Sequence, residues 1–141
     1  MEPDAKPGLF DLRTVKPKKI HNLDLQAYII SHKRLRGAVV TIALSGDFGK
    51  PRPAILLRSD HFNAHQLVSL VPLTTIRQNA PLLRIDIAPS TRNGLTTPSQ
   101  AMIDALQSVR VQRISRVIGQ LAAADLRRIA RPVAMYLGFA E

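Results

Sequence analysis

Between residues 50 and 53 an arginine stands between two prolines, in the order Lys50-Pro51-Arg52-Pro53. Pro51 fixes its own φ at about −65°, and Pro53 disfavours the helical region for Arg52, so the backbone around this cation is extended before any tertiary contact forms. A guanidinium that is held in one direction suits a phosphate or another oxyanion. The alternative is that the prolines only end a loop and that Arg52 is a solvated surface charge.

Asp104 is a second candidate, because it interrupts an apolar stretch that runs from Ala101 to Leu106. A carboxylate beside a core loses hydration, which makes it a stronger base for proton transfer. A structural role is the other interpretation, in which Asp104 pairs with Arg52 or orients a loop.

His61 and His65 are four residues apart around a turn and have no carboxylate pattern near them, so we expect neither a metal site nor a cofactor.

The charge of the chain predicts an acidic partner. The net charge is +10, and residues 37–141 contain 12 basic and 6 acidic residues, so the excess is not confined to the N-terminal part. Every cation in that range except Lys50 is arginine, whose planar fork pairs with phosphate in a bidentate manner. A nucleic acid or an acidic protein would fit this charge equally well.

The absence of cysteine from all 141 residues excludes a disulfide framework, a thiolate nucleophile and a cysteine-ligated zinc site. No apolar run approaches the roughly 18 residues of a membrane span, and the first residues lack the apolar stretch of a signal peptide. We therefore expect a cytoplasmic protein.

The elements that must position these residues are mostly short strands. Residues 1–35, which contain several prolines and a lysine cluster, are expected to form an N-terminal extension that is disordered or partly helical. Residues 36–141 are expected to form one domain, in which valine- and isoleucine-rich runs alternate with turn residues. The predicted strands are Gly37–Leu44, Pro53–Arg58, Gln66–Leu73, Leu82–Ala88, Gln100–Asp104, Val109–Val111 and Val117–Gln120.

The last segment has the period of a helix, because its apolar residues fall on one face. These residues are Leu126, Ile129, Ala130, Val133 and Leu137. Pro132 costs on the order of 3 kcal/mol inside a helix, so we expect a kink or two shorter segments there. Gly138 is expected to end the helix in a left-handed conformation. Together these elements predict a mostly β fold, a small SH3-like antiparallel β-barrel with a C-terminal α-helix.

Seven segments resemble, in their order and spacing, the MazF/PemK-type toxins of the CcdB/PemK-like fold. The resemblance covers the chain from about Arg36 to Gly138. The segments are Arg36-Gly37-Ala38-Val39-Val40, Lys50-Pro51-Arg52-Pro53-Ala54-Ile55-Leu56, Ser59-Asp60-x-Phe62-Asn63, Val71-Pro72-Leu73-Thr74-Thr75, Gly94-Leu95, Met102-Ile103-Asp104 and Ile118-Gly119-Gln120-Leu121.

This resemblance implies a metal-independent, sequence-specific endoribonuclease of a type II toxin–antitoxin pair, which cuts single-stranded RNA by attack of the ribose 2′-OH. Arg52 matches the arginine of the family's Arg-Pro motif and Thr74 matches the threonine after its third strand. Both residues are expected to hold the scissile phosphate. Judged by itself, Thr74 would be an ordinary strand threonine. The implied partners are RNA, an acidic antitoxin and a second copy of the chain, with no membrane.

Two departures from the family pattern bear on the site. The PemK branch has an arginine two residues before the aspartate that matches Asp104, and this chain has Met102 there, which leaves Asp104 without its local cation. The loop of residues 45–50 is short, so base specificity cannot be transferred. Within it Phe48 either stacks on a base or folds back on the core. The residues expected to contact RNA are Lys50, Phe48, Arg77 and Arg84.

Two other functions remain open at this point. The CcdB toxins use the same fold to poison DNA gyrase through the end of the chain, and this chain ends with aromatic residues around a glycine, Tyr136-Leu137-Gly138-Phe139. Arg52 and Thr74 have no evident use in gyrase binding. The third possibility is a protein of the toxin fold that binds RNA and no longer cuts it.

Overall fold

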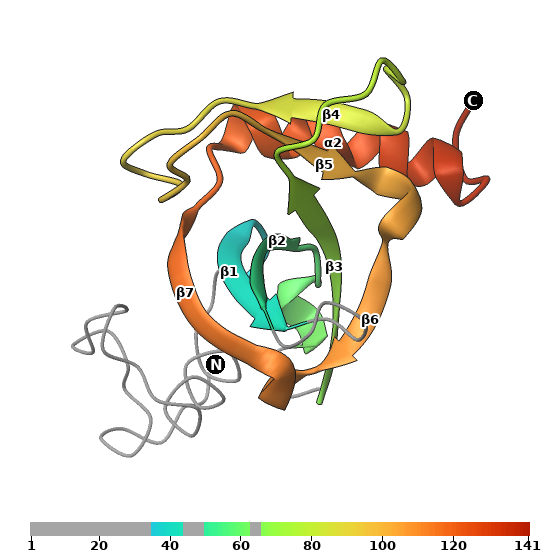
Figure 1. Cartoon of the computed structure of the whole chain (residues 1–141). Coiled ribbons are helices and arrows are strands. Elements are labelled where there is room, and N and C mark those ends of the chain that lie inside the picture. Colours follow the sequence, from blue (N-terminus) through green and yellow to red (C-terminus); the bar gives the residue numbers. More distant parts are fainter. Residues whose placement is uncertain (1–34, 44–49, 63–65) are drawn as a thin grey trace.

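The computed structural model describes residues 35–43, 50–62 and 66–141. This part of the chain forms a seven-stranded antiparallel sheet and one C-terminal α-helix (Figure 1). The strands are β1 (Ala38–Ala43), β2 (Pro51–Leu56), β3 (Leu67–Thr74), β4 (Arg84–Ile87), β5 (Ser99–Met102), β6 (Gln107–Arg110) and β7 (Ile114–Gln120). The helix is α2 (Ala123–Tyr136), and the 3-10 turns are η3 (Asp60–Phe62), η4 (Ile103–Ala105) and η5 (Val111–Arg113).

The sheet has the strand order β4-β5-β3-β2-β1-β7, and β6 pairs with the first half of β3. It curls so strongly that β6 and β7 lie on opposite sides of the three central strands (Figure 1). Within the described residues β4 and β7 do not pair, so the barrel is not closed. The predicted class, a small antiparallel barrel with a C-terminal helix, is confirmed.

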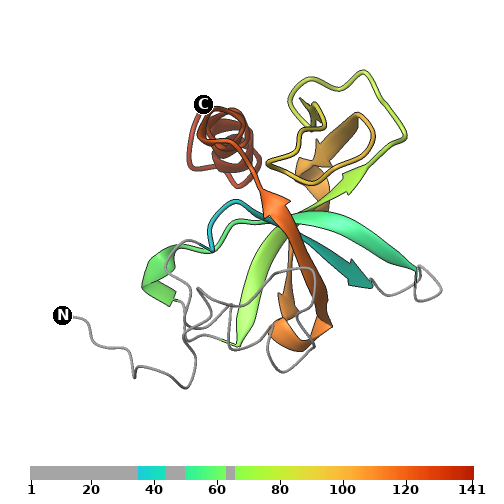
Figure 2. The same cartoon turned by 90° about the vertical axis from the view of Figure 1, so that its left-hand side faces the viewer.

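The central strands are apolar on both faces, and this explains their continuous valine and isoleucine runs. Val40, Leu56 and Leu70 face one core cluster inside the curl of the sheet. Their neighbours Val39, Ile55 and Val71 face a second cluster, which also contains Ile129 of α2. Figure 2 shows α2 nearly end-on, and the helix packs against β4 and η4. Among the described residues no helix is long and apolar enough to cross a membrane.

Several predicted strand boundaries were wrong. β2 begins at Pro51 and ends at Leu56, because its first residues pair with β1. β5 ends at Met102, and the predicted continuation to Asp104 is the 3-10 turn η4. β4 is shorter than predicted, β7 is longer, and β6 covers Gln107–Arg110 instead of Val109–Val111.

The helix α2 continues through Pro132, so the predicted division into two segments is wrong. Of the five residues predicted to share a buried face, Ile129 is buried and Leu126 and Val133 pack partly against the second cluster. Ala130 and Leu137 are exposed. The predicted end of the helix is confirmed, since Gly138 has φ of +86° and the Phe139 N–H donates to the carbonyl of Ala134 at 2.7 Å.

Candidate active site

The two prolines around Arg52 lie within strand β2, where Pro53 is opposite Thr41 and Arg52 is opposite Ile42 of β1. Further along, the Leu57 N–H donates to the Ser69 carbonyl. Donor groups alternate in direction along a strand, so the nitrogens of Pro53 and Pro51 also face β3. Proline has no N–H to give, and the pairing of β2 with β3 accordingly ends at Ala54 and Pro72.

Beyond Pro72 the strand β3 leaves β2 and pairs with β5, Leu73 with Ala101 and Thr74 with Gln100. If the register between β2 and β3 is continued by two residues, Thr74 lies opposite Arg52. A hollow of about 100 Å³ opens where the two strands separate, and we call it the β2/β3 hollow. It is lined by Lys50, Pro51, Arg52, Pro53, Leu73, Thr74, Thr75 and Ser99. Three predicted site residues, Lys50, Arg52 and Thr74, are therefore brought together.

Thr74 presents a hydroxyl whose orientation is constrained by the backbone. Its Oγ1 accepts a hydrogen bond from the Ile76 N–H at 3.1 Å. The hydroxyl proton is not used in that bond and can be donated to a bound oxyanion. A guanidinium and a hydroxyl are both hydrogen-bond donors of the kind that the oxygens of a phosphate group accept.

Asp104 does not line the hollow, and it forms an ion pair with Arg84. The Asp104 side chain is 37% exposed, so the buried position expected for a base is not found, whereas that of Arg84 is only 13% exposed. Arg84 is directly opposite Met102 in the ladder between β4 and β5. The expectation that Asp104 lacks a local cation was therefore wrong, because the neighbouring strand supplies one. Because of this ion pair, the guanidinium of Arg84, a predicted RNA contact, is bound to the Asp104 carboxylate.

Arg77 and Phe48 complete the set of predicted RNA contacts. Arg77 follows β3, its side chain is 54% exposed, and it donates to Asp86 at 3.0 Å. Arg77 is thus a second exposed arginine besides Arg52, three residues after Thr74, and its guanidinium is held by Asp86. Phe48 lies outside the described residues.

Sequence reasoning missed Thr75 and Ser99, which line the hollow, and Gln100, which is 5% exposed and opposite Thr74. A glutamine directly before the apolar residues Ala101 and Met102 of a strand is a signal of a buried polar contact. Its partners could not be found, because they depend on the register of three strands. Among the described residues no group of three metal-binding side chains occurs.

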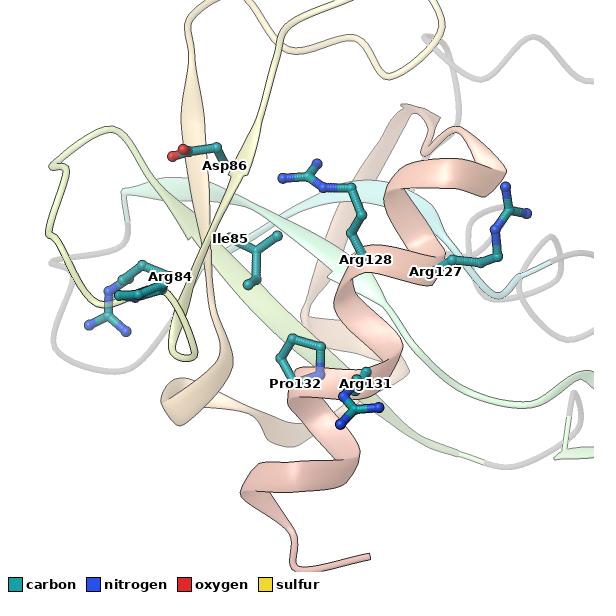
Figure 3. Close-up of a pocket in the computed structure, with 8 residues that line it drawn as sticks. Arg84, Ile85, Asp86, Arg127, Arg128, Arg131 and Pro132 are labelled. Carbon is teal, nitrogen blue, oxygen red and sulfur yellow. The ribbon is translucent and has the colours of Figure 1, made fainter. Parts of the chain in front are cut away.

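A second, larger depression of about 490 Å³ lies between β4 and α2, and we call it the helix groove. It is lined by Pro81, Arg84, Ile85, Asp86, Arg127, Arg128, Arg131 and Pro132. Figure 3 shows that Ile85 points toward the helix, whereas Arg84 and Asp86 point away from it. The charge of the groove thus comes mainly from the three arginines of α2, of which Arg128 pairs with Asp125.

Several known proteins are similar to this chain in sequence or in structure. The probable endoribonuclease MazF of Mycolicibacterium smegmatis is 41% identical over 106 residues, 74% of this chain and 97% of the relative. An endoribonuclease in complex with its cognate antitoxin, from a mycobacterial species, has a TM-score of 0.64 at 24% identity, over 76% of this chain and 97% of that one. MazF in a MazE–MazF complex of Deinococcus radiodurans has a TM-score of 0.61 at 18% identity, over 78% and 100% of the chains. At these identities the two structures show the fold alone.

The sheet and its hollow define a small antiparallel β protein that offers an arginine and a threonine hydroxyl to an anionic group. The family model of PemK-like, MazF-like toxins of type II toxin–antitoxin systems matches residues 35–137. The chain belongs to this family. The alternative of a CcdB-like gyrase poison finds no support in these comparisons.

Proposed function

We propose that this protein is a toxin that cleaves single-stranded RNA at specific sequences in the cytoplasm, without a metal ion, and that the β2/β3 hollow holds the scissile phosphate. The observation that carries the proposal is the presence of Arg52 and Thr74 in one hollow, at the point where the prolines end the pairing of β2 with β3. Relatives in the same family include a probable endoribonuclease.

Cleavage would proceed by attack of the ribose 2′-oxygen on the adjacent phosphorus. The bond from the 2′-oxygen to phosphorus forms and the bond from phosphorus to the 5′-oxygen breaks. The 2′-OH loses its proton to solvent and the 5′-oxygen gains one, which leaves a 2′,3′-cyclic phosphate and a 5′-OH end. Negative charge grows on the non-bridging oxygens, and the Arg52 guanidinium and the Thr74 hydroxyl stabilise it more in the transition state than in the ground state.

Asp104 has a structural role in this proposal. Its carboxylate pairs with Arg84 and does not line the hollow. Among the residues that the structure describes, those that line the hollow include no carboxylate and no histidine. Lys50 and Arg77 are the proposed RNA contacts among the described residues. Lys50 lines the hollow, and Arg77 is exposed and follows Thr74 of the hollow by three residues in the chain.

The proposed partners are a second copy of the chain and an acidic antitoxin. Large apolar side chains are exposed on the described surface, Phe139 at 85% and Ile76 at 72%, with Leu82, Tyr136 and Leu137 also exposed. Such residues are commonly covered in an interface. The cationic surface would be neutralised by an acidic protein and would attract RNA in a salt-dependent way.

The test is to incubate the protein in EDTA with an RNA that it cuts and with the same RNA carrying one 2′-deoxynucleotide at the mapped cleavage position. We expect discrete cuts with cyclic phosphate and 5′-OH ends in the first substrate and none at that position in the second. Undiminished cutting of the deoxy-substituted position would contradict the mechanism. Complete loss of activity in EDTA that added magnesium restores would contradict metal independence.

A further inference from the structure

A row of polar side chains crosses the sheet from the β2/β3 hollow to its edge at β4. Thr74 of β3 is opposite Gln100 of β5, and Gln100 is opposite Asp86 of β4. Continuing the register of β2 adds Arg52 at the other end. Directly opposite residues project from the same face of a sheet. Both the hollow and Arg77, which is paired with Asp86, therefore belong to one surface.

Gln100 is the buried centre of this row. Its side-chain oxygen accepts from the Gln78 N–H at 2.9 Å, and its nitrogen donates to the Gln78 carbonyl at 3.2 Å. The same nitrogen donates to Asp86 at 3.0 Å. One amide thus binds both backbone groups of a residue in the segment after β3, much as a neighbouring strand would.

These bonds fix a very short segment at both of its ends. Thr74 is held in the ladder with β5, Gln78 is held by the Gln100 side chain, and Thr75, Ile76 and Arg77 lie between them. The Ile76 N–H, which orients the Thr74 hydroxyl, is inside this segment. Arg77 is inside it as well, and Asp86 accepts from both Arg77 and Gln100. A displacement of Gln78 would therefore move a proposed phosphate donor and a proposed RNA contact together.

We propose that Gln100 is a positioning residue for RNA cleavage, which fixes residues 74–78 so that the Thr74 hydroxyl and the Arg77 guanidinium share one face of the sheet with Arg52. This role rests on the endoribonuclease function proposed above. Gln100 does not touch the phosphate. The hydrogen atoms of its amide group are engaged by Gln78 and Asp86, so its contribution is geometric.

Replacement of Gln100 should loosen the segment without unfolding the domain, because Gln78 is exposed and water can take the place of the lost partners. Gln100→Ala is expected to lower the single-turnover cleavage rate by on the order of 10-fold to 100-fold, as small misplacements of catalytic groups do. The RNA dissociation constant should change much less. Amide hydrogen exchange should become faster in residues 75–78 and stay unchanged in β1 and β2.

Asn93→Ala is the matched control. Asn93 is also a buried side-chain amide with three backbone hydrogen bonds, to Ala88, Ser90 and Leu95, and none of these residues lines the hollow. This variant should lose stability while its cleavage rate, measured well below its melting temperature, stays at the wild-type value. Asp86→Ala provides a second variant at an exposed position, which removes one Gln100 bond and the ion pair with Arg77 without opening the core, and it should give a smaller loss of rate because both Gln100 bonds to Gln78 remain.

The outcomes separate this proposal from the function on which it rests. A folded Gln100→Ala protein that cleaves at the wild-type rate, or that keeps wild-type exchange in residues 75–78, would overturn the positioning role and leave the endoribonuclease proposal intact. An equal loss of rate in Asn93→Ala would overturn it too, since that result indicates a general effect of stability. A wild-type protein that never cuts RNA would overturn the proposed function itself.

Discussion

The β2/β3 hollow and the helix groove are both lined by arginines, yet they differ in what surrounds those cations. The helix groove is about 490 Å³ and receives three arginines from α2, whereas the hollow is about 100 Å³ and has one arginine with one lysine. In the hollow the arginine belongs to an extended, proline-flanked strand, and a threonine hydroxyl lines the same hollow. The arginines of the groove project from a helix face and are exposed, and none of the described residues that line the groove supplies such a donor.

The number of charges and the volume of a depression determine where an anion accumulates, whereas fixed donor geometry determines where it reacts. Long-range attraction depends on the number of charges and weakens with salt. Stabilisation of a transition state needs donors that are aimed in advance at the oxygens on which charge develops. On this account the hollow should control the chemical step, and the groove should influence only the encounter with RNA.

The largest effect is expected for Arg52→Ala, which removes the cation from the hollow. The cleavage rate of bound RNA should fall by on the order of 10²-fold to 10³-fold, which is the usual cost of losing one preorganised oxyanion donor. Single-turnover kinetics at saturating protein measure this rate. Circular dichroism should show the wild-type fold, because Arg52 is exposed.

Thr74→Ala should have the next largest effect, a loss of on the order of 10-fold to 100-fold in the same rate, because a neutral donor contributes less than a charged one. Thr74→Ser keeps the hydroxyl and is the matched control, so it should retain most of the activity. If serine and alanine reduced the rate equally, the hydroxyl would not be the group that matters.

Asp104→Asn separates the two roles considered for this residue. Loss of a general base lowers a rate by roughly 10²-fold to 10⁴-fold. As the partner of Arg84, Asp104 should instead affect stability, and we expect the free energy of unfolding to fall by about 1 kcal/mol with cleavage unchanged. Urea unfolding and single-turnover kinetics on the same preparation decide between them.

The smallest effect is expected for the double variant Arg127→Ala/Arg131→Ala in the helix groove. Both side chains are exposed, so the variant should bind RNA slightly more weakly. The slope of log affinity against log salt should become less steep, by about 0.7 for each phosphate contact of a single strand that is lost. Titration of labelled RNA at several salt concentrations measures this slope, and an unchanged slope would show that the groove does not attract RNA.

The sequence predicted the parts of the site that depend on local chemistry. Prolines on both sides of Arg52 impose an extended backbone wherever the segment lies. The resemblance of the segment around Thr74 to the toxins placed that residue just after the third strand, and the structure has it as the last residue of β3. Gly138 was also predicted correctly, because a left-handed residue after a helix is a local preference.

The parts that depend on register could not be predicted. The cation beside Asp104 comes from Arg84, which is twenty residues away in the chain and opposite Met102, so it is not among the sequence neighbours of Asp104. The role of Gln100 depends likewise on the pairing of β3, β5 and β4. Pro132 was predicted either to kink the helix or to divide it into two segments, and the division is not found, because α2 continues through it, with Ile129 and Val133 on either side packed against the second core cluster.

The most direct test of the central claim compares Arg52→Ala with Arg127→Ala/Arg131→Ala by single-turnover cleavage in EDTA, at protein concentrations that saturate the RNA, with the 5′ ends of all fragments mapped. We expect the groove variant to cut at the same positions and at the wild-type rate, while Arg52→Ala leaves the RNA intact on that time scale. A groove variant that loses the cleavage rate at saturation, or an Arg52→Ala protein that keeps it, would contradict the assignment of the chemistry to the β2/β3 hollow.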